Sequence, residues 1–317
     1  MPWLILFFLI ASEAGAQSAP PASPALRAPG SAGGYSLTPF VVHDSDDPVD
    51  SSNASPVVDH GRLAIVGGVL AGGMAAIHIY QQNGWWADNR APFHFQEDLT
   101  YGLGVDKIGH FYGATVLAFV FGNALRWANV SEADALWAGS AGSLLFQTYV
   151  EIEDGYSAWG FDRVDFAANL AGASWPIAQH YLPLLENVNL KLSYVPSPLI
   201  DNAGGAGFRG QKHLMMDDYE GQTFWLALKP RAVLPEAAKR YWPESLGLAL
   251  GYGARDIAAT ASRPYRVVFL SLDYDMTKII PQETGFLRTL SRALNFIHFP
   301  APAVRISPSA IWYGIYF

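Results

Sequence analysis

The stretch that decides the fold is Asp106-Lys107-Ile108-Gly109-His110, which opens a long apolar segment. Burying ionisable side chains in apolar helices costs free energy, so three of them within five residues indicate either charged partners or a functional role. Helical spacing places His110 four residues from Asp106 and three residues from Lys107, so the three side chains can share one face. The segment is therefore predicted to be a helix with a polar site at its start.

Two later segments supply polar groups at matching spacing. Glu151 and Asp154 lie three residues apart near the end of one apolar stretch, and Asp165 and Asn169 lie four residues apart at the start of another. Each pair can occupy one face of a helix. We expect these faces to meet the first one in a single polar cluster inside an apolar bundle.

Four apolar stretches have the length of helices, and together they predict a four-helix bundle over residues 61–81, 105–127, 132–152 and 162–182. The first stretch is almost uncharged from Leu63 to Tyr80. About 18 residues is the lower end of what a membrane span needs, so this segment is either a bilayer helix or a fully buried one.

After Pro183 the apolar pattern changes to a period of two. Runs that alternate or are rich in β-formers predict antiparallel strands over residues 190–194, 223–228, 246–252, 267–274 and 311–317, with a short helix over 285–296. The last run resembles the final strand of an outer-membrane protein. The predicted fold class is α+β: a four-helix bundle, embedded in or apposed to a membrane, followed by an antiparallel β-sheet.

The N-terminal residues indicate export. A short apolar run over residues 4–11 is followed by Ala14-Gly15-Ala16, which is typical of a cleaved signal peptide, and an uncleaved anchor is the alternative. The next residues are rich in Ala, Pro and Ser and are expected to form a disordered leader. The predicted organisation is a signal peptide (1–16), leader (17–60), helical bundle (61–183) and β-rich region (184–317).

The composition narrows the class of protein. Half of the residues are apolar, 15% are charged and 14% are aromatic, which indicates a membrane or a very large core. The net charge of −8 argues against nucleic acid as a partner. The chain contains no cysteine, which excludes disulfides, thiolate catalysis, cysteine metal sites and lipid attachment to a cysteine.

The expected cluster offers four carboxylates and one imidazole, those of Asp106, Glu151, Asp154, Asp165 and His110. Three interpretations stay open, beside transport or a proton relay. The oxygen and nitrogen donors suit a divalent metal ion. General acid–base chemistry would pair His110 with a carboxylate while Lys107 holds an anion such as phosphate. In a structural role, the charges would neutralise one another and fix the helix register.

These motifs resemble the YfiM-like proteins, which are predicted periplasmic lipoproteins of unknown function. The strings that carry the resemblance are Asp106-Lys107-x-x-His110, Glu151-x-x-Asp154-Gly155-x-Ser157, Trp159-Gly160-Phe161, Asp165-x-x-x-Asn169 and Asp218-Tyr219-x-Gly221-Gln222-Thr223-Phe224-Trp225-Leu226. Two features depart from the family pattern: Asp162 stands where the family usually has Ser, and no cysteine is present for lipidation. The helical half more distantly resembles VanZ-like membrane proteins, which implies a shared membrane-facing polar site.

The sequence therefore predicts an exported, membrane-associated cell-envelope protein of the periplasm or outer membrane that binds or processes a lipid-linked or phosphate-bearing amphiphile. Asp106, Lys107 and Asn169 are the expected ligand-binding residues, and the catalytic ones are His110, Glu151, Asp154 and Asp165. The alternatives are a structural envelope protein whose cluster only fixes helix packing, or a metal-binding module. Membrane lipid or a lipid-linked substrate is the expected partner, and no cofactor, metal or oligomeric state is assigned. A ligand-sized pocket beside His110 would favour the active role, and a sealed, fully paired cluster the structural one.

Overall fold

The computed structural model describes residues 57–83, 86, 90–198, 215–216, 218–257 and 263–317. The predicted signal peptide and the leader up to residue 56 lie outside these residues. The domain boundaries proposed from the sequence stay predictions. The first described helix begins at His60 and the first strand begins at Val188.

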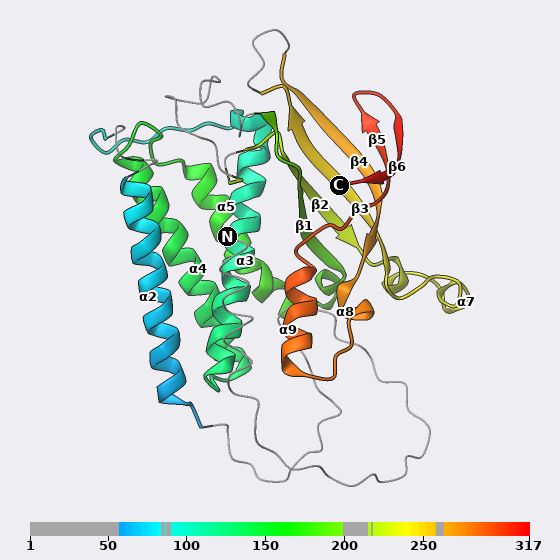
Figure 1. The fold of residues 1–317 in the computed structure, drawn as a ribbon, viewed down its shortest axis with the longest axis horizontal. Helices are drawn as coiled ribbons and strands as arrows, with labels where there is room; N and C mark the ends of the chain where they lie inside the picture. Colours follow the sequence, from blue (N-terminus) through cyan, green and yellow to red (C-terminus); the bar gives the residue numbers. More distant parts are fainter. Residues whose placement is uncertain (1–56, 84–85, 87–89, 199–214, 217, 258–262) are drawn as a thin grey trace.

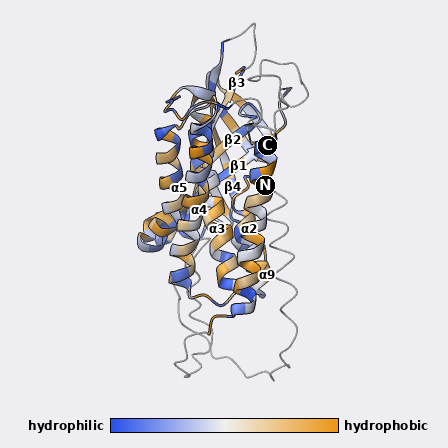
Figure 2. Cartoon of the chain, turned by 90° about the vertical axis from the view of Figure 1, so that its left-hand side faces the viewer, coloured by the Kyte–Doolittle hydropathy of each residue, from blue (hydrophilic) through white to orange (hydrophobic). Residues whose placement is uncertain are grey.

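Four long helices lie alongside one another and form one half of the molecule (Figure 1). They are α2 (His60–Gln82), α3 (Val105–Trp127), α4 (Glu132–Gly155) and α5 (Arg163–Tyr181). Side-chain oxygens of Asp59, Ser131 and Asp162 accept hydrogen bonds from the first backbone N–H groups of α2, α4 and α5, so three of the four helices start at a capping residue. Hydrophobic residues run along their length (Figure 2).

The other half is a six-stranded antiparallel sheet in sequence order. Its strands are β1 (Val188–Tyr194), β2 (Gln222–Leu228), β3 (Leu246–Arg255), β4 (Tyr265–Tyr274), β5 (Ala301–Ser307) and β6 (Ile311–Tyr316). Short helices are η2 (Tyr101–Gly104), η3 (Pro183–Asn187), η5 (Pro230–Ala232), α7 (Glu236–Lys239), α8 (Met276–Ile279) and α9 (Gly285–Leu294). The predicted α+β class, a helical bundle followed by an antiparallel sheet, is confirmed.

One strand was not predicted from the sequence. Strand β5 begins Ala301-Pro302-Ala303, and a proline within a run normally lowers the expectation of a strand because it cannot donate to the ladder. The structure nevertheless pairs β5 with β4 and β6.

Helix α3 lies between the other helices and the sheet. At its N-terminal end, Val105 packs with Phe224 of β2 and Ala254 of β3. Further along, the Tyr112 hydroxyl donates to the Phe296 carbonyl at 2.8 Å, and the rings of Phe119 and Phe296 are in edge contact. Burial on both sides explains why α3 carries apolar residues around its whole circumference.

Glycines allow α3 to approach its neighbours closely. A Cβ at Gly139 of α4 would lie 2.6 Å from the backbone nitrogen of Gly122, and a Cβ at Gly172 of α5 would overlap the carbonyl oxygen of Phe111. Small residues at such crossings are what allow two helix backbones to pack in contact.

We expect Gly172→Ala to lower the free energy of unfolding by about 1–3 kcal/mol, because α3 and α5 must move apart to admit the methyl group. Thermal denaturation of the purified protein measures the effect. Gly68→Ala is the matched control, since nothing lies within 4 Å of a Cβ there. Equal melting temperatures for the two variants would show that the α3–α5 contact is not tight.

Candidate functional site

Lys107 lies among three carboxylates at the N-terminal end of α3. Its Nζ is 3.0 Å from Asp106 Oδ2, 2.9 Å from Asp162 Oδ2 and 2.8 Å from Asp165 Oδ2. An ammonium group has three N–H donors, and here each has an acceptor. The predicted role of Lys107 in holding an anion stays a prediction, and in this arrangement an anion would have to displace one of the three carboxylates. Lys107 joins the start of α3 to the start of α5.

His110, one turn further along α3, is held from both sides of its ring. Nδ1 is 3.3 Å from Glu151 Oε1 and 3.2 Å from Asn169 Oδ1, while Nε2 is 3.6 Å from Asp106 Oδ1 and 3.8 Å from Asp165 Oδ2. The side chain is 23% exposed. A ring fixed through Nδ1 has a defined orientation and presents Nε2 to a proton or ligand.

Asn169 connects α5 to α4 beneath the His110 ring. It is fully buried, its Nδ2 donates to Glu151 Oε1 at 2.9 Å, and its Oδ1 accepts from Gln147 Nε2 at 2.8 Å. Gln147, which was not predicted, lies four residues before Glu151 and so on the same face of α4. This amide chain fixes which acceptors face Nδ1 of His110.

Asp162 caps α5 and also belongs to the charged group. Its Oδ1 accepts from Val164 N at 2.7 Å, and its Oδ2 accepts from Asp98 N at 2.9 Å besides Lys107. Although burial opposes it, the hydrogen bonds from Lys107 and the two backbone groups hold the pKa of Asp162 below its usual range. A serine at this position could supply the cap but not the charge.

Asp154 lies beside the network rather than on His110. Its Oδ1 accepts a 2.7 Å hydrogen bond from the indole of Trp86, which precedes Asp154 in the chain by 68 residues. Tyr219, from the sheet side, donates to Asp106 Oδ1 at 2.6 Å. Neither aromatic residue was predicted as a site residue, although Tyr219 belongs to the Asp218-Tyr219-x-Gly221 string. Trp86 follows the end of α2 and Tyr219 precedes β2, so both come from outside the three helices that carry the cluster.

The structure thus brings six of the seven predicted site residues into one connected network and places Asp154 at its edge; the six are Asp106, Lys107, His110, Glu151, Asp165 and Asn169. The roles assigned to these residues stay predictions.

Burial raises the pKa of two acidic groups at the end of α4. Burial raises the pKa of Glu151 to about 8, and the nearby His110 only partly offsets this. Burial likewise raises the pKa of Asp154 to about 7, against the hydrogen bond from Trp86. Both carboxyls can therefore give or take a proton at physiological pH.

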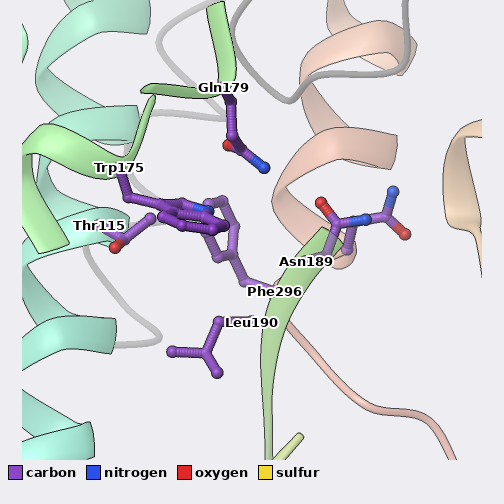
Figure 3. Close-up of a pocket in the computed structure, with 7 residues that line it drawn as sticks. Thr115, Trp175, Gln179, Asn189, Leu190 and Phe296 are labelled. Atoms are coloured by element: carbon purple, nitrogen blue, oxygen red, sulfur yellow. The ribbon is translucent and has the colours of Figure 1, made fainter. Parts of the chain in front are cut away.

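The cluster is neither sealed nor beside a described pocket. A cavity of about 10 Å³, enough for one water molecule, lies between α3, α5 and the sheet and is lined by Thr115, Trp175, Gln179, Asn189, Leu190, Asn295 and Phe296 (Figure 3). None of these residues belongs to the cluster. Within the cluster, the buried Asp165 Oδ1 has no hydrogen-bond partner among the described residues. Each charged side chain of the cluster has a partner, as a structural role requires, and in the described part of the chain the single buried oxygen of the cluster left over is Asp165 Oδ1.

Three side chains could hold a metal ion. One ligand atom each from Asp106, His110 and Asp165 lie within 4.8 Å of one another. Two carboxylates and one imidazole suit a divalent ion such as iron, manganese or zinc. Lys107 already neutralises one oxygen of each carboxylate, so an ion would have to compete with its ammonium group.

A second buried charge network lies on the face of the sheet turned away from α3, and the sequence did not predict it. Lys191 Nζ is 2.8 Å from Asp273 Oδ2, and Asp273 Oδ1 is 3.2 Å from His298 Nδ1. The His298 ring stacks on Trp225 with centroids 3.9 Å apart, and its Nε2 is 3.3 Å from Ser271 Oγ. Burial lowers the pKa of Lys191, and Asp273 opposes that shift. Alternation along β1 and β4 places these polar groups inside, a pattern that a single strand cannot reveal.

Comparison with known proteins supports the resemblance drawn from the motifs. Residues 94–180 match the model of a family described as predicted periplasmic lipoprotein (DUF2279). Comparisons with curated proteins and with solved structures gave no match. The VanZ-like resemblance stays a prediction. The matched residues include every residue predicted for the site, and the family's description agrees with an exported, membrane-associated protein of the periplasm. The helices that carry the cluster thus lie in the stretch that is similar to this family of predicted periplasmic lipoproteins.

Proposed function

We propose that this envelope protein binds the polar head group of an amphiphile at the cluster and transfers protons there through His110. The observation that carries the proposal is the state of His110: its Nδ1 is held by Glu151 and Asn169, its Nε2 faces Asp106 and Asp165, and part of the ring reaches the surface. A histidine oriented by a carboxylate at one nitrogen is the arrangement that general acid–base chemistry uses.

The charge of the cluster limits which class of ligand it can bind. Even with Glu151 and Asp154 protonated, the carboxyl groups of Asp106, Asp162 and Asp165 outnumber the two basic groups, Lys107 and His110. A free phosphate would meet like charge here, and Lys107 has no donor left for it. Hydroxyl or amino groups of a lipid-linked head group fit better, because carboxylates accept their hydrogen bonds.

Conversion of the amphiphile should depend on the imidazole of His110. We expect His110→Gln to slow it by about 10²–10⁴-fold, because glutamine can fill the site but cannot exchange a proton at neutral pH. Purified protein is incubated with an envelope lipid extract, and mass spectrometry follows which species co-purify with it and which change. His180→Gln, at the far end of α5, is the control and should behave as wild type.

The structural alternative makes the opposite prediction. If the cluster only fixes helix packing, His110→Gln will lower the melting temperature and no amphiphile will co-purify or change with wild type. A folded His110→Gln variant that converts lipid as fast as wild type would also refute the proposal.

A divalent-metal site is the second candidate, favoured by the unpartnered Asp165 Oδ1 beside His110 and Asp106. Elemental analysis of the purified protein checks it. A stoichiometric metal that is lost in Asp165→Asn supports this candidate, and absence of any stoichiometric metal in wild type rules it out.

A further inference from the structure

The described helices carry their charges in two layers, with an uncharged belt between them. One layer holds the cluster, at the start of α3 and α5 and the end of α4. The other holds Asp59 and Arg62 at the start of α2, Arg126 at the end of α3, and Glu132 at the start of α4. No Asp, Glu, Lys or Arg occurs between the layers, over residues 63–80, 111–125, 135–150 and 166–179.

Helix α2 is long and apolar enough to cross a membrane, and only 6% of its most apolar window is buried. The segment Tyr101–Trp127 passes the same test, but 56% of its window is buried, as expected of a core helix. At about 1.5 Å per residue, the 18 uncharged residues of α2 span about 27 Å, close to the ~30 Å hydrocarbon layer of a bilayer.

The side of α2 that faces away from the bundle is apolar. Val66 is the one buried residue of the helix, and Leu70 and Ile77 pack against the core. On the other sides Ile65 and Ile79 are 56% and 60% exposed, with no charged residue between them. A helix on the surface of a water-soluble protein normally carries polar residues on that face.

Helix α4 continues this apolar surface. Trp137, Leu145 and Ile152 fall on one exposed stripe, and Leu145 is 70% exposed. Helix α5 adds the exposed Leu170. Exposed large apolar residues thus occur on three helices of the bundle, which is the kind of surface that marks an interaction site.

The contacts at the end of α2 set the depth of the cluster. His78 is hydrogen-bonded to Tyr149, Gln82 Nε2 donates to Glu153 Oε2 at 3.2 Å, and Trp86 donates to Asp154. The C-terminal end of α2 is therefore level with the acidic end of α4. Aromatic rings gather at this level, among them Phe93, Phe95 and Tyr156, as they do where a protein crosses the head-group region of a membrane.

We infer that the outer surface of α2, together with the exposed stripes of α4 and α5, lies in the hydrocarbon of a lipid bilayer, and that the cluster lies at the level of the head groups of one leaflet. Helix α2 precedes the residues that match the lipoprotein family, and the chain has no cysteine to carry a lipid. The helix provides the membrane attachment that a lipid chain would otherwise give. This inference does not depend on proton transfer by His110.

Because the chain contains no cysteine, single cysteines can carry a spin label at chosen sites. We would label Met74→Cys on α2 and Leu145→Cys on α4 in the full-length protein, reconstituted in phosphatidylethanolamine–phosphatidylglycerol vesicles. Val57→Cys, just before α2, is the aqueous control, and Tyr156→Cys reports the level of the cluster. Power saturation by oxygen and by a nickel chelate gives the depth of each label.

The expected result is that Met74→Cys and Leu145→Cys are accessible to oxygen and shielded from nickel, Tyr156→Cys has an intermediate value, and Val57→Cys is accessible to nickel. Nickel access at Met74 and Leu145 would overturn the inference. Spin–spin broadening at Met74 would also overturn it, because a second copy of the chain would then cover α2. Wild-type protein should resist alkaline carbonate extraction from membranes, and its release by carbonate would count against the inference without any substitution.

Discussion

Lys107→Met is expected to lower the free energy of unfolding by about 3–5 kcal/mol, the cost typical of leaving a buried charge group without its partner. The ammonium group lies 2.8–3.0 Å from oxygens of Asp106, Asp162 and Asp165, and these carboxylates would face one another without it. Methionine keeps most of the side-chain volume, so the loss is mainly electrostatic. Thermal denaturation of the purified protein in detergent measures it.

Two comparisons make the Lys107 result specific. Lys239→Met removes the exposed Lys239–Glu236 pair and should change stability by no more than about 0.5 kcal/mol. Lowering the pH should reduce the difference in stability between Lys107→Met and wild type, because protonation removes the repulsion among the three carboxylates. A variant as stable as wild type at neutral pH would show that the three carboxylates are not charged together.

Lys191→Met, in the second charge network on the sheet, is also expected to lower the free energy of unfolding by about 3–5 kcal/mol. Lys191 is 1% exposed and contacts Asp273, whose other oxygen contacts His298. The double variant Lys191→Met/Asp273→Leu should recover most of the loss, since replacing a buried pair by apolar groups is often neutral. Neither change should alter conversion of the amphiphile by more than a few-fold.

A double variant less stable than Lys191→Met alone would contradict this account, because Asp273 would then stabilise the sheet without Lys191. Loss of conversion in a stable double variant would point to a functional role for the sheet network as well. Melting temperatures and the lipid assay on the same preparations separate these outcomes.

Much of the helical half could be predicted because its information is local. The segment predicted over residues 105–127 is α3 itself, and the segment predicted over residues 132–152 lies within α4 and starts at the same residue. Apolar periodicity and capping act within one or two turns, so a single segment contains what is needed to recognise them. Strand β5 was not predicted because Pro302 has no backbone N–H to donate to a neighbouring strand. Its pairing with β4 and β6 outweighs that local disadvantage.

The sequence predicted which residues form the site, but it could not predict which of them contact one another. The spacing of Asp106, Lys107 and His110 placed them on one face of a helix, and the structure keeps them there. That Lys107 is occupied by three carboxylates could not be predicted, since Asp162 and Asp165 come from a helix more than fifty residues away. An anion-binding lysine and a lysine saturated by acids have the same local sequence.

The sequence alone determined the helices, the change to strands after Pro183 and the identity of the polar residues among apolar ones, because these depend on periodicity and on the cost of burying charge. Only the tertiary structure decided that Tyr219 reaches Asp106 across 113 residues, that Trp86 holds Asp154, and that the charges fall in layers at the ends of an uncharged belt. Partners in a folded chain are chosen by how helices and sheet pack against one another, and that choice is made between segments that no single stretch of sequence contains.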